Sequence, residues 1–290
     1  MSKFINLPYK MLIYDVETSL LLAWLFSLGD QVVRHNQLVE CAVMFGILTI
    51  SYKWYGEKKV TVLKGKDTLE KFDKIARTAD VIIGKNNFRF DDKRINTERM
   101  LKGLPPFPEW STRSDDLESQ LRKYFSFPSY SLDAISKHLG LGGKKKMEFD
   151  DWVRIAKYDL YLKFMDYDES GCKCGEGFCK TLFNTKRSQV ILEGKLAYSK
   201  MGTYNGKDVL DTEAILIKVL PYIKLKKNAS AIFDGKGCIL CGSTKLIPTK
   251  IVTAGQTKYQ EFTCLEHNGY GGRATYRYDK QRHKQFGKVT

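Results

Sequence analysis

The feature that most constrains the fold of this chain is an apolar run, Met11-Leu12-Ile13-Tyr14, that leads directly into Asp15 and Glu17. Side chains at positions i and i+2 of a β-strand project from the same face, so these two carboxylates lie side by side. Two like charges at this spacing are costly unless a cation lies between them, and Mg²⁺ and Mn²⁺ prefer carboxylate oxygens. A solvated strand end would explain the same pair. The metal interpretation therefore depends on finding further ligands.

The net charge points to a polyanionic partner. The chain has 290 residues and a formal net charge of +15, with basic residues spread along its length. Lys and Arg side chains that neutralise phosphates release counterions, which favours nucleic acid as the partner; a solubilising surface is the alternative. The longest apolar stretch, residues 20–26, is too short to cross a bilayer, and the first residues lack a signal-peptide layout. We therefore expect a cytoplasmic protein with no membrane partner.

Hydrophobic periodicity predicts an α/β domain over residues 1–225, with a mixed central sheet flanked by helices, followed by a small β module over residues 228–290. Strands are expected at 11–16, 40–50, 57–63 and 80–84, and helices at 68–78, 91–102, 131–139, 148–166, 190–201 and 206–222. A Gly- and Cys-rich segment at about 168–187 interrupts the helical pattern, and a basic connector at 224–227 precedes the β module.

Two further segments of the α/β domain offer polar ligands. Asn86 and Asn87 follow an expected strand, and Asp91 and Asp92 open the next helix, where the helix dipole alone favours acids. Farther along, Tyr204 and Asp208 are four residues apart and share one helix face. Each segment also has an ordinary interpretation. The first acids could cap their helix, and Tyr204 could pack on the core while Asp208 faces water.

Taken together, these segments resemble the three motifs of DEDD-type 3′–5′ exonucleases, a family of the ribonuclease H-like superfamily that includes the proofreading domains of DNA polymerases. The matching runs are DVET at 15–18, the Asn…Phe-Asp segment at 86–91 and Y-x-x-x-D-V at 204–209. A tyrosine four residues before the last aspartate is typical of the subclass called DEDDy. The other subclass has a histidine five residues before that aspartate, where this chain has Thr203. The runs at 35–40, 103–106 and 131–144 resemble a virus-encoded branch, which would act in the host cytoplasm.

The resemblance implies roles for named residues. Asp15, Glu17, Asp91 and Asp208 would bind two Mg²⁺ or Mn²⁺ ions, which at about 4 Å apart support in-line displacement at phosphorus. Tyr204 would orient the attacking water. Asp92 matches less well than Asp91, because Phe90 immediately precedes Asp91 as the family pattern requires.

The implied activity is hydrolysis of nucleic acid from a 3′ end, with single-stranded DNA preferred over RNA, in replication, proofreading or repair. A DNA polymerase or another replication protein would be the partner, and Asn86 and Asn87 would contact the nucleic acid. One alternative is a structure-selective endonuclease on the same fold. The other is a catalytically inactive nucleic-acid-binding or polymerase accessory module.

The β module contains a pattern typical of a structural zinc site. Cys238-x-x-Cys241 and Cys264-x-x-His267 are separated by 22 residues, which suits a Cys₃His zinc ribbon; buried free cysteines with a surface histidine are the alternative. Interleaved basic and aromatic residues surround the pattern and suit single-stranded nucleic acid, although solubilising surface and core would use similar residues. The predicted contacts are Lys258, Arg273 and Arg277.

The segment at about 168–187 supplies three more thiols, Cys172, Cys174 and Cys179. A second zinc ion could bind there if a histidine or an acid completes the ligand set. A flexible cysteine-bearing insertion explains the segment equally well.

Overall fold

The computed structural model describes residues 5–20, 46–143, 146–164, 187–227, 235–276 and 286–289. The resembling run at 35–40, the three thiols of the 168–187 segment and Arg277 lie outside the described residues. Within the described ranges, none of the helices combines the length and the apolarity needed to cross a membrane.

The central sheet has five strands in the order β3-β2-β1-β4-β5. Their bounds are Met11–Thr18 for β1, Ile47–Trp54 for β2, Thr61–Lys64 for β3, Val81–Gly84 for β4 and Ser114–Asp116 for β5. Strands β1, β2 and β3 pair antiparallel, whereas β1, β4 and β5 run parallel. The prediction of a mixed sheet flanked by helices is confirmed, and β5 is a strand that the sequence did not predict.

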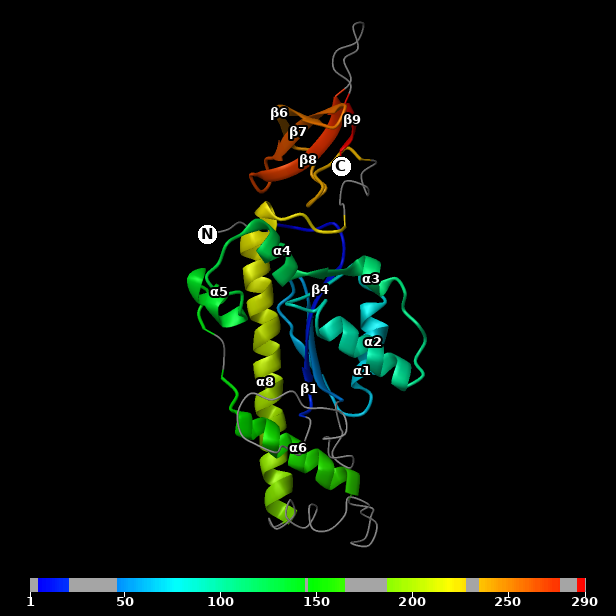
Figure 1. Ribbon diagram of the computed structural model, residues 1–290, viewed down its shortest axis with the longest axis vertical. Helices are drawn as coiled ribbons and strands as arrows, with labels where there is room; N and C mark the ends of the chain where they lie inside the picture. The colour runs from blue at the N-terminus through cyan, green and yellow to red at the C-terminus, as the bar shows by residue number, and fades with distance from the viewer. Residues whose placement is uncertain are drawn as a thin grey trace, which may run out of the picture.

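Helices cover both faces of this sheet, as Figure 1 shows for α8 on one side and α1 and α2 on the other. The helices are α1 Thr68–Ala76, α2 Asp91–Leu101, α3 Trp110–Arg113, α4 Leu117–Tyr124, α5 Leu132–His138, α6 Phe149–Phe164 and α8 Arg187–Val219. Alternation along β1 assigns its side chains to the two faces. Leu12 and Tyr14 pack in one core with Phe72 of α1, whereas Met11 and Ile13 pack in the other core with α8.

Helix α8 is one continuous helix of 33 residues, about 50 Å long at 1.5 Å per residue. The prediction of two separate helices, at 190–201 and 206–222, was therefore wrong. Glycines inside this helix are positions of close packing. A Cβ on Gly194 would lie 2.3 Å from Cβ of Tyr158 in α6, and one on Gly206 would lie 3.5 Å from Val60. A buried ion pair between Lys53 of β2 and Glu213 also fixes α8 across the sheet.

The C-terminal module packs directly on the end of the central sheet where β1 begins (Figure 1). Its strands are β6 Leu246–Ala254, β7 Thr257–Cys264, β8 Gly269–Tyr276 and β9 Phe286–Val289, in that order in one antiparallel sheet. Cys238, Leu240 and Cys264 are buried in the same core as Met11. The connector takes part as well, because Lys226 donates its backbone N–H to Asp115 over 2.9 Å. The module and the α/β domain thus share a core.

Candidate active site and metal centre

Three of the predicted acids converge at the end of β1. Asp15 and Glu17 lie on the strand face that α8 covers, and Asp208 lies on the buried side of α8 together with Thr212 and Ile215. The positions 208, 212 and 215 follow the spacing of one helix face. One carboxylate oxygen from each of the three acids lies within 4.8 Å of the others. Asp208 is buried and the two strand acids are half-buried, so the three acids form a candidate metal site.

Asn205 orients the first of these acids, a role that sequence reasoning missed. Its Nδ2 donates to Oδ2 of Asp15 over 2.6 Å, although the two residues are 190 positions apart. Its Oδ1 accepts from the hydroxyl of Thr49 in β2 at 3.2 Å, and the side chain is fully buried. The available signal was position, because Asn205 stands three residues before Asp208 and therefore on the same side of the helix.

Asp91 is not a member of the three-acid group, but it is bonded to the same strand end. Its Oδ1 accepts the backbone N–H of Val16, the residue between Asp15 and Glu17, at 2.9 Å. Only 5% of Asp91 is exposed. Burial raises the pKa of its carboxyl to about 7, with smaller contributions from the charges of Asp92 and Asp116. This acid therefore does more than cap α2, since its carboxylate bonds to a strand distant in sequence.

Asp92 and Asn87 belong to a buried hydrogen-bond network that also includes Tyr14 and Ser114. Asp92 accepts from the hydroxyls of Tyr14 and Ser114, and Asn87 donates to Ser114 over 3.0 Å and to Asp92 over 3.3 Å. Asn87 has no exposed surface, so its amide supports the turn after β4 from within the core. Asn86 is half-buried and adopts a left-handed backbone conformation with φ of 64° in that turn.

Tyr204 lines a pocket of about 610 Å³ between α6 and α8. Its half-buried ring makes an edge contact with Trp152 of α6, with 5.8 Å between the centroids. Arg154 and Lys200 line the same pocket, and both donate to the buried Asp151, over 2.9 Å and 3.1 Å. Glu148 and Glu193 also line this pocket, so basic and acidic side chains are mixed around Tyr204.

The second group of ligands is the predicted set Cys238, Cys241, Cys264 and His267, which lie close enough together to hold a metal ion. Sγ of Cys241 is 3.6 Å from Sγ of Cys264, and Sγ of Cys238 is 3.3 Å from Nε2 of His267. Zinc bonds of about 2.3 Å to sulfur and about 2.0 Å to nitrogen give tetrahedron edges of about 3.8 Å between two sulfurs and about 3.5 Å between sulfur and nitrogen. The observed separations are within about 0.2 Å of these edges and are far longer than the disulfide bond length of about 2.05 Å.

The thiols of this group influence one another strongly. A hydrogen bond with Cys241 lowers the pKa of Cys238, and the same bond together with burial raises the pKa of Cys241 to about 12. Leu240 donates its backbone N–H to Sγ of Cys238 over 3.4 Å, which favours a thiolate there. Three thiols crowded in this way ionise together only beside a cation. The donor set therefore fits a metal better than it fits three free thiols.

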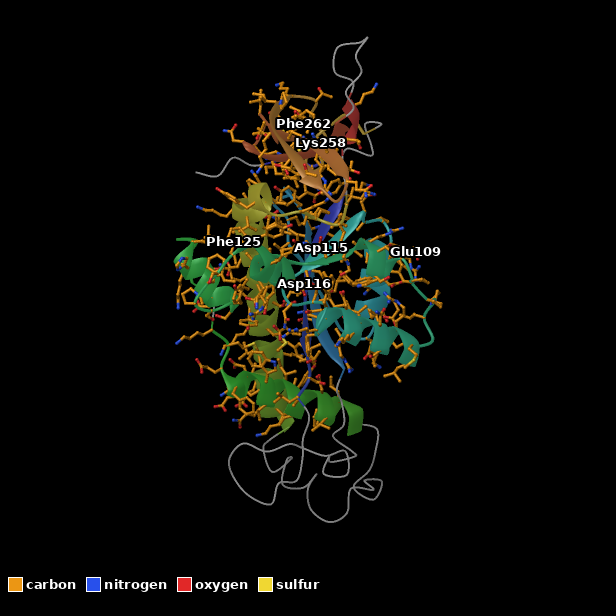
Figure 2. The ribbon with its side chains drawn as sticks, turned by 45° about the horizontal axis from the view of Figure 1, so that its top comes forward. Glu109, Asp115, Asp116, Phe125, Lys258 and Phe262 are labelled. Carbon is orange, nitrogen blue, oxygen red and sulfur yellow. The ribbon has the colours of Figure 1, made fainter. Side chains whose placement is uncertain are left out.

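Two of the predicted nucleic-acid contacts of the module, Lys258 and Arg273, lie on its sheet. Lys258 is exposed on β7, and Figure 2 shows it near Phe262 of the same strand. Arg273 of β8 is half-buried, and its guanidinium lies over the ring of Tyr259, 4.4 Å from the centroid.

Comparisons with known proteins place the chain in no family. No protein-family model matches it, and no curated protein matches it. Among solved structures, it is similar to the family B DNA polymerase from the hyperthermophilic archaeon Pyrobaculum calidifontis, with a TM-score of 0.37 and 10% sequence identity. The match covers 88% of this chain and 32% of the polymerase chain, so the chain spans about a third of that polymerase's length.

Proposed function

We propose that this protein is a metal-dependent 3′–5′ exonuclease of the DEDDy type with a ribonuclease H-like domain, acting on single-stranded DNA. One observation carries the proposal. Asp15 and Glu17 from β1 and Asp208 from α8 bring carboxylate oxygens within 4.8 Å of one another. The fourth acid of the pattern, Asp91, bonds to the backbone between the two strand acids.

The donor chemistry of this cluster fits divalent metal. Closely packed carboxylates repel one another when they are ionised, and hard cations such as Mg²⁺ or Mn²⁺ offset that repulsion. When bound, two such ions supply Lewis acidity and an activated water at the scissile phosphate. Asp15, Glu17 and Asp208 would hold them, with Asp91 completing the charge after it loses its proton.

Other residues near the acids would position a metal ligand, the attacking water and the nucleic acid. Asn205 fixes the orientation of Asp15 through its short hydrogen bond. Tyr204 would place its hydroxyl beside the attacking water; a phenol with an ordinary pKa near 10 is a weak base at neutral pH, which favours a positioning role. Arg154 and Lys200, held by Asp151, would attract the phosphate backbone into the pocket beside Tyr204.

In the module, we propose one structural zinc ion bound by Cys238, Cys241, Cys264 and His267, and a role for the surrounding surface in nucleic-acid binding. The separations between ligand atoms support the zinc assignment. The net charge of +15 supports a polyanionic partner.

The proposal is tested by digesting end-labelled single-stranded DNA and RNA with the full chain and Mg²⁺ or Mn²⁺, followed by denaturing gel analysis. A 5′-labelled strand should shorten progressively, and a 3′-labelled strand should release labelled nucleoside monophosphate first. Asp208→Asn should lower the rate at least about a thousandfold, because the interaction of metal with developing charge contributes several kcal/mol. Its thermal unfolding should stay close to that of the wild type.

Asp133→Asn is the matched control, because Asp133 is an acid of α5 that pairs with Lys137 and lies outside the cluster. This control should retain full activity. Internal cuts would identify a structure-selective endonuclease instead. Binding without any metal-dependent cleavage would contradict the proposal and leave a nucleic-acid-binding module.

A further inference from the structure

A groove of about 790 Å³ lies where the C-terminal module meets the end of α8 and the short 3₁₀ helix η3, Leu220–Tyr222. It is lined by residues of η3, α8 and the module sheet, among them Lys218, Tyr222, Lys250, Thr263, Asn268 and Tyr270. None of the acids of the candidate active site lines it, whereas His267 of the cysteine site does. The groove is therefore separate from the acid site and adjoins the cysteine site.

The walls of the groove are fixed to each other through backbone contact. A Cβ on Gly269, where β8 begins, would lie 2.6 Å from the carbonyl oxygen of Pro221 in η3, so only glycine lets the two segments approach this closely. Ile223, directly after η3, is buried in the core that also contains Cys238 and Cys264. Because both sides belong to one core, the groove is formed before any ligand arrives.

Exposed tyrosine rings line this groove from two elements. Tyr222 of η3 is 67% exposed and Tyr270 of β8 is 40% exposed. The ring of Tyr222 is held at one edge by Phe125, with 6.0 Å between the centroids. Figure 2 shows Phe125 on the side of the α/β domain below the module. Rings held in this way and open to solvent are suited to stacking with a planar ligand.

The charges around these rings are mainly positive. Lys218 and Lys250 line the groove. The acid that lines the groove is Glu261, which is 3.7 Å from the ammonium group of Lys250. Cations beside exposed rings form the combination that binds single-stranded nucleic acid, because bases stack on the rings while the cations follow the phosphates.

The groove is well separated from the acids. Asp208 and Lys218 are ten positions apart in α8, which corresponds to about 15 Å along the helix. Asp15 is likewise four residues along β1 from Met11, which packs in the core shared with the module. A strand held in the groove would therefore have to extend along the molecule before its end reached the acids.

We propose that this groove is a second binding site for single-stranded nucleic acid, which holds the strand upstream of the end that is being hydrolysed. The proposal rests on the nuclease function proposed above for the identity of the ligand, but binding in the groove does not require cleavage. It predicts that affinity depends on strand length. A strand that reaches both sites binds more tightly than one that fills the acid site alone, since the second contact is intramolecular.

The test measures fluorescence anisotropy with labelled oligodeoxynucleotides of about 4 and about 16 nucleotides, lengths that bracket common single-strand site sizes. The protein is the full-length Asp208→Asn chain without added Mg²⁺ or Mn²⁺ and without chelator, so the strand stays intact and any zinc stays bound. Tyr222→Ala combined with Tyr270→Ala should weaken binding of the longer strand about tenfold or more, through lost stacking. Binding of the shorter strand should not change.

Tyr222→Phe combined with Tyr270→Phe is the matched control, because it keeps both rings and should keep the affinity for the longer strand. The proposal would be overturned if the variant with both alanines bound the longer strand as tightly as the Asp208→Asn parent, which keeps both tyrosines. A polyglutamate peptide that binds more tightly than DNA, and loses binding in the alanine variant, would also overturn it and identify an acidic protein partner. Length-dependent binding by a protein that never cleaves would leave the groove assignment standing and remove the nuclease assignment.

Discussion

The two candidate metal sites are constructed in opposite ways. The ligands of the cysteine site all lie between residues 238 and 267 and come from two adjacent short segments. The acid site joins β1 to α8, and its orienting bond between Asp15 and Asn205 spans 190 positions. The environments differ as well, since Cys238 and Cys264 have no exposed surface, whereas Asp15 and Glu17 are half-exposed.

This difference indicates what each metal would do for the protein. At the cysteine site, a metal would link segments that form part of the shared core, so its binding energy contributes to folding. At the acid site, the fold holds like charges together, which costs stability until a cation binds. We therefore expect loss of metal to unfold part of the protein at one site and to stop activity without unfolding at the other.

The largest expected effect is the loss of stability when zinc is removed. Chelation, or Cys264→Ser, should destabilise the chain by several kcal/mol, because Cys264 is buried in one core with Met11 and Leu117. The test compares the thermal unfolding temperature with and without chelator and measures zinc content in parallel. Asp208→Asn is the comparison variant and should unfold at or above the wild-type temperature. Complete zinc loss without any change in unfolding would remove the distinction between the two sites.

The same contrast explains how much could be predicted from sequence. The cysteine pattern is local, so its spacing alone predicted the ligand set. The acids were found through strand alternation, helix spacing and resemblance, because Asp15, Glu17 and Asp208 stand in short motifs. Asn205 was missed because its role depends on a hydrogen bond to a distant strand, which no local pattern contains.

Two errors in the predicted fold have the same physical origin. Strand β5 consists of Ser114, Asp115 and Asp116, which are buried yet polar, so no apolar pattern marked it. These residues are stabilised by specific bonds instead, such as the one from Gln120 to Asp115 at 2.9 Å. The continuous helix α8 was predicted as two helices, and the gap between them contains Gly202 and borders Gly206, residues of low helix propensity. In the structure, α8 continues through both glycines, where a Cβ would contact Val62 of β3.

A smaller effect is expected from loss of the bond that orients Asp15. Asn205→Ala should lower the affinity for Mn²⁺ and the rate of hydrolysis about 10- to 100-fold, the usual cost of removing a side chain that orients a metal ligand. Metal titration by calorimetry and single-turnover hydrolysis measure the two quantities. Leu210→Ala, at an exposed position of α8 outside the pocket beside Tyr204, is the control and should change neither. Zinc content should be unchanged in both variants, and a loss of zinc in Asn205→Ala would show that the two sites are coupled.

The smallest expected effect concerns the packing of α6 on α8 at Gly194, a position distant from both groups of ligands. Gly194→Ala should destabilise the protein by about 1 to 3 kcal/mol, because the new methyl group would overlap Tyr158 and force α6 to move. Gly202→Ala is the matched control on the same helix, because its Cβ would meet Val62 at 3.4 Å, an ordinary contact. There the gain in helix propensity should stabilise the protein by up to about 1 kcal/mol.

Urea unfolding of both glycine variants measures these opposite changes in the free energy of unfolding. Hydrolysis assays of the same variants test whether the acid site is affected. Because Tyr204 contacts Trp152 of α6, a displaced α6 should reduce turnover in Gly194→Ala while leaving the cysteine site able to bind zinc. Stabilisation of the protein by both substitutions would mean that α6 does not pack on Gly194, and that the position of Tyr204 depends on α8 and the sheet alone. The acid site would then depend on fewer distant contacts, and the contrast with the cysteine site would be correspondingly smaller.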